Sequence, residues 1–418
     1  MDLPKMIRIR QTFEARILED ISGEISTQIA RLELEKRVKK GQTVAVACSS
    51  RGIANYGDIV EATVRSLQEL EFKPFIIPAM GSHGAATAEG QKRVLEHHGI
   101  SESRMGVPIR SSLEVIQIGE TEEGVPVFLD KVASEADYIV PVNRIKSHTD
   151  FEYEIESGLM KMIAIGLGKQ HGAAVYHQAC FNHGFPSVIL AVARKILESG
   201  RILFGVGIVE NGNCQTAKIG VLAPENLEEK EKHLLNEAKR LEPRLPFEDV
   251  DMLIIDEMGK DISGSGIDTK VVGRIHMPLL AEEPKTPRVK RIIVTDLTEN
   301  SDGNAVGIGM ADFVPKRLVK KVDYDATYIN AITGGDPEHA KIPLTLENDR
   351  ETIEVAAKSV GMIPPESLRI MRIKSTKHLR VVDISTAYKE ELGKRKDLEI
   401  VSEGRPMTFD KDGNLERF

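Results

Sequence analysis

The feature that most constrains this chain is a regular alternation of short β-branched runs with longer stretches that carry charges on one face. The short runs end in glycine or polar turn residues. They predict strands at 43–47, 74–80, 137–142 and 203–209, and the longer stretches predict helices at 53–70, 87–98 and 187–198. Such alternation predicts an α/β fold with a mostly parallel, helix-covered sheet, whose active sites lie in loops at the carboxyl ends of strands.

A strongly charged helix predicted at 225–241 is followed by Glu242-Pro243-Arg244-Leu245-Pro246, where two prolines interrupt regular structure. Since 418 residues exceed the usual size of one domain, we predict two α/β domains, 1–246 and 247–418. Strands at 250–255, 291–295, 326–332 and 369–373 are expected in the second. The polar last residues, from about 402, are expected to fray or to pack back on the first domain.

The composition limits the kinds of partner. A net charge of -8 and the absence of a basic stripe argue against nucleic-acid binding. The three cysteines form no CxxC pair, which argues against a disulfide framework and a zinc site. The sequence shows neither a signal peptide nor an apolar run of membrane-spanning length, so a cytoplasmic protein without membrane contact is expected. Nothing argues against an oligomer.

Histidines gather in a glycine-rich segment: of the 11 in the chain, four are His148, His171, His177 and His183. A fifth, His83, directly follows a predicted strand and precedes a helix, where α/β sheets present catalytic groups. For any one of these, a solvated loop histidine is an equally good explanation.

Lys161 interrupts the otherwise apolar stretch 159–167. Lysine is seldom fully buried unless it is paired or chemically used, and an amine there could form a covalent bond. The alternative is an amphipathic helix with Lys161 on its wet side, and spacing alone favours that alternative.

Taken together, Gly81-Ser82-His83, His148, Lys161 and His177 at their spacings, with Arg51 after the first predicted strand, resemble the nickel-dependent lactate racemases and related hydroxy-acid racemases and epimerases. The resemblance covers most of residues 40–275. It implies an isomerase whose active site lies at the domain interface, with the C-terminal domain closing over the substrate.

The resemblance also implies a cofactor. In this family a nickel ion is held in a sulfur-carbon-sulfur pincer on pyridinium-3,5-bisthiocarboxylic acid mononucleotide, which is joined to a lysine as a thioamide; Lys161 matches that lysine. His177 matches the histidine that binds nickel sixteen residues further on, and His171 and His183 are its nearby competitors. Because square-planar nickel in a pincer needs only one protein ligand, no dense histidine and cysteine cluster is required. Separate biosynthetic enzymes must supply such a cofactor.

The family's remaining site residues have counterparts here. His83 and His148 match two catalytic histidines on opposite sides of the substrate, and Arg51 matches the arginine that binds its carboxylate. Lys270, in the loop 260–270, matches a substrate-binding lysine. Ser49 and Ser50 are predicted to meet the cofactor phosphate near a helix start.

One departure concerns the substrate, because Cys48 stands where lactate racemases have an aspartate. The resemblance therefore implies a racemase or epimerase of a 2-hydroxy acid, acting by proton-coupled hydride transfer, and leaves open acids other than lactate. Two alternatives stay open: a C2 epimerase of a longer sugar acid with the same cofactor, and a non-catalytic nucleotide- or metal-binding protein. A zinc hydrolase is disfavoured because no HExxH motif is present.

Overall fold

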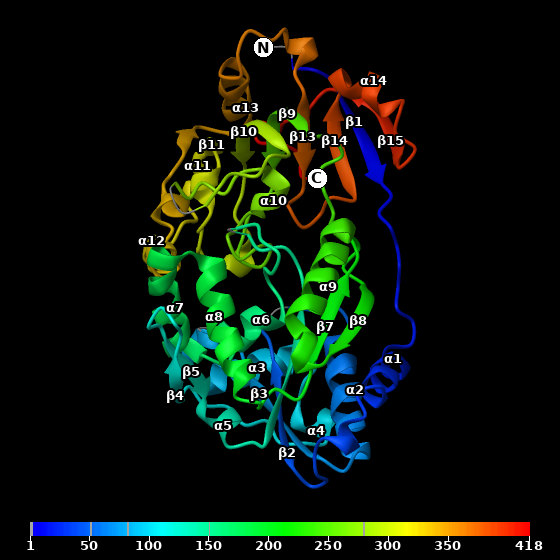
Figure 1. Cartoon of the computed structure of the whole chain (residues 1–418). Coiled ribbons are helices and arrows are strands. Elements are labelled where there is room, and N and C mark those ends of the chain that lie inside the picture. Colours follow the sequence, from blue (N-terminus) through cyan, green and yellow to red (C-terminus); the bar gives the residue numbers. More distant parts are fainter. Residues whose placement is uncertain (1–2, 51, 82, 150, 279–280) are drawn as a thin grey trace. The chain divides into compact units, whose positions relative to one another are not determined.

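The computed structural model describes residues 3–50, 52–81, 83–149, 151–278 and 281–418. The chain divides into two compact units, which are Glu14–Glu242 and, together, Met1–Phe13 and Pro243–Phe418 (Figure 1). We call them the N-terminal and C-terminal units. The division after Glu242 lies within the proline-containing segment, whereas residues 1–13, which we expected in the first domain, belong to the C-terminal unit.

The N-terminal unit is built on a sheet of strand order β3-β2-β6-β7-β8, in which the first four strands are parallel and β8 is antiparallel to β7. Its strands are β2 (Thr43–Cys48), β3 (Lys73–Pro78), β6 (Tyr138–Arg144), β7 (Gly205–Glu210), β8 (Thr216–Leu222) and the separate hairpin β4 (Val115–Glu120) and β5 (Pro126–Asp130). Its helices are α1 (Ile21–Ala30), α2 (Tyr56–Glu69), α3 (Ala88–His97), α4 (Glu102–Met105), α5 (Lys131–Ser134), α6 (Leu159–Lys161), a π-helical turn (Met162–Gly166), α7 (Lys169–His183), α8 (Phe185–Glu198) and α9 (Leu227–Leu241).

Both faces of this sheet are buried, which explains why its strands read as continuous apolar runs. Successive residues of β2 point to opposite faces: Ala45 and Ala47 join a core with α8 and α9, whereas Val44 and Val46 join a core with α1 and α2. Helices therefore cover both sides of the sheet (Figure 1). The predicted α/β fold is confirmed.

The C-terminal unit has a mixed sheet of strand order β12-β11-β10-β9-β13-β14-β1-β15. Its strands are β1 (Met6–Gln11), β9 (Asp249–Ile255), β10 (Arg288–Val294), β11 (Phe313–Pro315), β12 (Leu344–Leu346), β13 (Ile370–Ile373), β14 (Val381–Ser385) and β15 (Leu398–Arg405). Its helices are α10 (Thr269–Val272), α11 (Lys316–Val319), α12 (Tyr324–Gly334), α13 (Asp349–Lys358) and α14 (Lys389–Leu392). The five strands from β12 to β13 are parallel, and β14, β1 and β15 extend the sheet with antiparallel pairs.

Pairing of β1 between β14 and β15 places the start of the chain in the C-terminal unit. The last residues also pack within this unit, where Leu415 and Phe409 join the core that contains Met252 and Ile254. We expected those residues to fray or to pack on the first domain. Their alternating apolar positions explain their place in the C-terminal core.

The strand predicted at 326–332 is wrong, because this stretch lies within helix α12. Asp323 accepts a hydrogen bond from the backbone N–H of Ala326 at 3.0 Å and caps the helix, which ends at Gly335 with a φ of 75°. The β-branched residues of the stretch suggested a strand, but the caps at both ends decide in favour of a helix.

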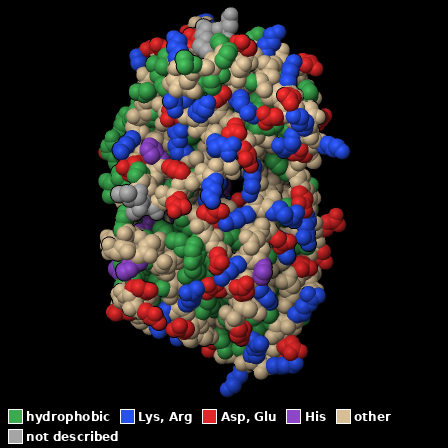
Figure 2. Space-filling view, turned by 45° about the horizontal axis from the view of Figure 1, so that its top comes forward, with side chains coloured by type: hydrophobic (Ala, Val, Ile, Leu, Met, Phe, Trp, Pro, Cys, Tyr) green, Lys and Arg blue, Asp and Glu red, His purple; other side chains and the backbone are tan. Residues whose placement is uncertain are grey.

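Acidic and basic side chains are interspersed over the face drawn in Figure 2. Among the residues that the structure describes, no helix is both long enough and apolar enough to cross a membrane.

Candidate functional site

Three of the predicted site residues surround the ring of Phe185 in the N-terminal unit. The Lys161 ammonium lies 5.6 Å from the centroid of that ring and donates a hydrogen bond to His148 Nε2. The His148 ring packs against Phe185 at 5.4 Å between centroids, and the His177 ring meets it edge-on at 5.4 Å. The structure thus brings His148, Lys161 and His177 together from three different elements.

The competing histidines occupy other surroundings. His171 packs edge-on against Phe128, with ring centroids 4.6 Å apart, and its side chain is exposed. His183 is exposed at the end of α7. Of the three histidines on this helix, His177 is the one whose ring shares Phe185 with Lys161.

Lys161 ends the short helix α6 and is followed directly by the π-helical turn. Such turns are rare and occur often at functional sites. The start of α6 is capped by the buried carboxyl group of Glu231, whose Oε2 accepts a hydrogen bond from the backbone N–H of Met160 at 2.9 Å. Gly158 permits this approach, because a Cβ there would lie 1.9 Å from Glu231 Oε1.

The Glu231 carboxyl is an unusual group to find below a helix of the site. Its side chain is 1 % exposed, and Oε1 has no hydrogen-bond partner within the described part of the chain. Burial raises the pKa of this carboxyl to about 8. Hydrogen bonds from the backbone N–H groups of Met160 and Leu159 lower the pKa but offset only part of this rise. Glu231 is therefore protonated in the folded protein over a much wider pH range than an ordinary glutamate.

His148 is buried by aromatic neighbours and held through its backbone. Its ring stacks on Phe151 at 4.2 Å, and its N–H donates to Glu156 Oε2 at 2.6 Å. Glu156 is itself buried and forms an ion pair with Lys239 of α9 at 2.6 Å. These contacts hold the loop after β6 and so set the position of His148.

His83 belongs to a second group, in the loop after β3. Its Nδ1 lies 2.8 Å from Ser50 Oγ, in the loop after the neighbouring parallel strand β2. The backbone carbonyl of Ser50 is held in turn by His98 Nε2 at 3.0 Å. Since a carbonyl only accepts, His98 carries a proton on Nε2. His83 itself is exposed, in contrast to His148.

Close backbone packing joins the His83 loop to the segment between Lys161 and His177. A Cβ on Gly166, in the π-helical turn, would lie 2.8 Å from the carbonyl oxygen of Ala79. A Cβ on Gly81 would contact Ile165 at 3.5 Å and Ala173 at 3.9 Å. The loop that carries His83 therefore lies directly on the helical segment that carries Lys161 and His177.

Cys48 ends strand β2, and Ser49 and Arg51 follow it in the sequence. Ser49 is buried and its backbone N–H donates to the hydroxyl of Tyr56 at 2.6 Å, so that this amide is already used inside the protein. Arg51 lies outside the described residues. Cys48 is buried at the end of β2, and burial raises the pKa of its thiol to about 12, which makes it an unreactive apolar residue.

Lys270 lies in α10 of the C-terminal unit, where Asp268 caps the helix by accepting from the Lys270 N–H at 3.0 Å. The loop before it follows the carboxyl end of β9, and its Lys260 ammonium donates to Gly264 O at 2.5 Å and to Asn330 Oδ1 at 2.9 Å. This is the edge of a parallel sheet at which ligands bind in α/β folds.

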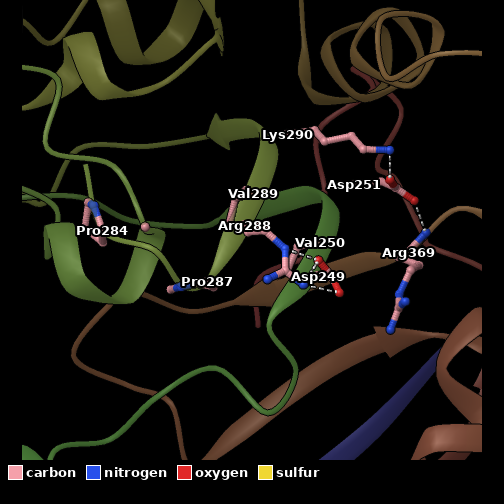
Figure 3. A pocket seen from close by; sticks show the side chains of 10 residues that line it. Asp249, Val250, Asp251, Pro284, Pro287, Arg288, Val289, Lys290 and Arg369 are labelled. Atoms are coloured by element: carbon pink, nitrogen blue, oxygen red, sulfur yellow. Dashed lines mark hydrogen bonds and ion pairs between the residues drawn. The ribbon is translucent and has the colours of Figure 1, made fainter. Parts of the chain in front are cut away.

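A cavity of about 480 Å³ lies at the opposite, amino-terminal edge of the same strands (Figure 3). Its charged side chains pair with one another: Arg288 binds both oxygens of Asp249, and Lys290 lies 2.7 Å from Asp251 (Figure 3). The third cation of the lining, Arg369, pairs with Glu391 outside it. Because the described lining contains none of the predicted site residues, we do not assign the cavity to the site.

Several residues that shape the site escaped sequence reasoning. Phe185 follows the predicted cluster by two residues and lay in no recognised motif. Glu231 lies in the helix predicted at 225–241, where it was one of many charged residues, although its spacing of three to four residues from Leu227, Leu234 and Leu235 places it on the buried face. Lys169 and its partner Gln91 are buried behind the His83 loop, and nothing in their local sequence distinguishes them from surface residues.

Within the described ranges no group of three or more histidine, cysteine or acidic side chains could hold a metal ion.

Comparison with known proteins gives one matching family model and similar solved structures. Residues 7–185 match the family model of the lactate racemase N-terminal domain. The fold is similar to that of the lactate racemase apoprotein from Thermoanaerobacterium thermosaccharolyticum, with a TM-score of 0.53, 12% sequence identity, and coverage of 90% of this chain and 99% of that one. A protein from Thermotoga maritima aligns with a TM-score of 0.49 and 14% identity over 88% of this chain and 99% of that one. No curated protein matches the sequence.

Proposed function

Because residues 7–185 match the lactate racemase N-terminal domain, we propose that this chain is a racemase or epimerase of a 2-hydroxy acid that carries a nickel pincer nucleotide on Lys161. The observation that carries the proposal is the contact of Lys161 with His148 beside Phe185, whose ring also meets that of His177. An amine for attachment, an imidazole for the metal and an imidazole for proton transfer are thereby gathered around one ring.

The residues present fit such a cofactor in number and chemistry. Lys161 is partly exposed at the end of a helix, and its amine is the group to which the cofactor would be joined. His177 is half-buried on the next helix and supplies a neutral nitrogen ligand of the kind nickel accepts. When bound, the cofactor supplies an acceptor and donor of hydride for the substrate carbon.

The protein's own residues move the hydroxyl proton. In the structure His148 Nε2 accepts from the Lys161 ammonium, since an ammonium can only donate. With the cofactor attached, Lys161 would carry no ammonium charge, and His148 Nε2 would be the atom that takes the hydroxyl proton of one enantiomer. A neutral His83 that donates from Nδ1 to Ser50 Oγ presents its own Nε2 in the same way for the other enantiomer.

Substrate binding is assigned by the family pattern to Arg51 and Lys270, whose positive charges suit a carboxylate. Buried, apolar Cys48 in place of an aspartate removes an anionic group from the strand end that precedes Arg51. We therefore propose that the substrate is a 2-hydroxy acid, with acids other than lactate included.

The attachment to Lys161 can be tested by mass. Protein produced together with the cofactor's biosynthetic enzymes should carry an added mass, and peptide mapping should place it on the fragment that contains Lys161. Lys161→Arg keeps the positive charge but cannot form the thioamide, so it should lose the added mass completely. Active, nickel-loaded protein with an unmodified Lys161 would contradict the attachment.

The role of His177 predicts a separate result. His177→Ala should lower nickel occupancy several-fold, as loss of a metal ligand removes a large part of the affinity, while the added mass on Lys161 remains. His171→Ala is the matched control on the same helix, because His171 packs on Phe128 instead. Full nickel retention in His177→Ala would transfer the ligand role to another residue.

Assays of the same cofactor-loaded protein distinguish two other possible functions. A C2 epimerase of a longer sugar acid would use the same cofactor and would invert one of several stereocentres. A non-catalytic binding protein would carry the cofactor and invert neither substrate. The presence of two histidines in two separate loops, His83 and His148, favours an enzyme, because a binding protein needs no proton carriers.

A further inference from the structure

We propose that Lys169 is a positioning residue for His83, and that it acts by orienting the amide of Gln91, which holds the His83 loop by two backbone carbonyls. This inference rests on the proposed role of His83 and adds two residues to the machinery of that site. It is carried by a buried hydrogen-bond network that joins three elements of the N-terminal unit.

Lys169 is the more unusual member of the network. Its side chain is 0% exposed, which a lysine tolerates only when its ammonium is fully paired. The three ammonium protons have three acceptors: Pro78 O at 2.7 Å, Gln91 Oε1 at 3.0 Å and Asp130 Oδ2 at 3.2 Å. The backbone at Lys169 has a φ of 55°, a costly conformation for a non-glycine residue that often accompanies function.

The Gln91 amide also has hydrogen-bond partners for both its oxygen and its nitrogen. Its side chain is 0% exposed, and Nε2 donates to Gly81 O at 2.9 Å and to His83 O at 3.3 Å. Only one orientation of the amide satisfies all of these partners, because the ammonium can only donate and the two carbonyls can only accept. The Lys169 ammonium therefore determines that the NH₂ group of Gln91 faces the His83 loop.

The consequence concerns the position of the His83 ring. Pro78 ends β3, and Gly81 and His83 follow it, so that the network holds the strand end and the loop at three carbonyls within six residues. Without the ammonium, the Gln91 amide can rotate and bring its oxygen against the carbonyls of Gly81 and His83. Misplacement of a catalytic group by about 1 Å lowers a rate by about a hundredfold.

A purely structural explanation is that Lys169 and Asp130 form a buried ion pair that stabilises the core. Burial lowers the pKa of Lys169 and raises that of Asp130, and each charge opposes the effect on the other. Asp130 also caps α5, by accepting from Val132 N–H at 2.8 Å and Ala133 N–H at 3.1 Å. The two explanations differ in the effect expected for Asp130 variants.

The test uses four variants of the full chain, with histidine labelled at Cε1 for NMR. Gln91→Glu keeps an acceptor for Lys169 and replaces the NH₂ group by an oxygen, and Gln91→Met removes both hydrogen-bonding functions without adding charge. Lys169→Met removes the ammonium at similar length. Asp130→Asn breaks the ion pair but leaves the contact between Lys169 and Gln91, which makes it the matched control.

We expect the His83 signal, assigned by its loss in His83→Ala, to shift or broaden in the Gln91 and Lys169 variants. It should stay at the wild-type position in Asp130→Asn, even if the melting temperature of that variant falls. In loaded enzyme, kcat should fall by about a hundredfold in the Gln91 and Lys169 variants with little change in KM.

An unshifted His83 signal in folded Gln91→Glu or Gln91→Met would overturn the inference. An equal shift in Asp130→Asn and Lys169→Met would assign Lys169 to core stability alone. If the loaded wild-type protein inverts no 2-hydroxy acid, the proposed function fails, and the NMR comparison still decides whether Lys169 positions His83.

Discussion

Replacement of His83 or His148 by alanine should reduce turnover of the 2-hydroxy acid by about a hundredfold to ten-thousandfold, the usual cost of losing a general acid-base group. The added mass on Lys161 should remain in both variants. Turnover in each direction should be measured from the pure enantiomer by chiral chromatography. Because a racemase must reach equal amounts of two enantiomers, kcat/KM must fall equally in both directions.

The two variants should differ in stability, which gives an internal control. His83 is exposed, so its loss should leave the melting temperature within a degree or two of the wild type. His148 is 5% exposed and packs on Phe151 and Phe185, so its truncation should destabilise the protein by about 1–3 kcal/mol. His148→Gln fills more of the space and should recover stability without activity.

A deuterium label separates two mechanisms that both use these histidines. With deuterium on C2 of the substrate, hydride transfer should return most of the label to the product, whereas proton abstraction through a carbanion would exchange it with water. Rapid loss of the label during inversion would refute hydride transfer and retain His83 and His148 as bases.

The second large effect concerns how the free energy of unfolding depends on pH. Glu231→Gln should remove a loss of stability that the wild type shows between about pH 5 and pH 8. The folded protein holds the Glu231 proton up to about pH 8, whereas the unfolded chain releases it near the ordinary value of 4.5, so unfolding releases a proton within this range. The free energy of unfolding of the wild type therefore falls as the pH rises through this range.

At pH 9 the Gln variant should exceed the wild type in the free energy of unfolding by up to about 4 kcal/mol, and at pH 5 the two should agree closely. Urea denaturation at both pH values measures the difference. Glu228→Gln is the matched control on the same helix: the hydrogen bond from Arg194 lowers the pKa of Glu228, so its loss should not produce a gain at high pH. Identical pH profiles for wild type and Glu231→Gln would contradict a buried, protonated Glu231.

Much of the fold could be predicted from local patterns. Strand β2 was expected at 43–47 and runs over Thr43–Cys48, and helix α9 was expected at 225–241 and runs over Leu227–Leu241. These elements combine strong hydrophobic periodicity with clear ends, so local and tertiary preferences agree. Helix α12 was predicted to be a strand because its β-branched residues favour strands. Its two caps, Asp323 and Gly335, lie outside residues 326–332.

For the site, the sequence by itself determined the residue types and their spacing along the chain: His83 after a strand, Lys161 within an apolar stretch and His177 sixteen residues beyond it. Spacing along a helix and position after a strand are local properties, and they survive folding. Only the tertiary structure decided that Phe185 contacts both Lys161 and His177, that Glu231 is buried at the start of α6, and that β1 joins the C-terminal sheet. Those facts depend on contacts between residues far apart in the sequence. The burial of Lys169 against Pro78, Gln91 and Asp130 depends on three such contacts at once, which no local pattern encodes.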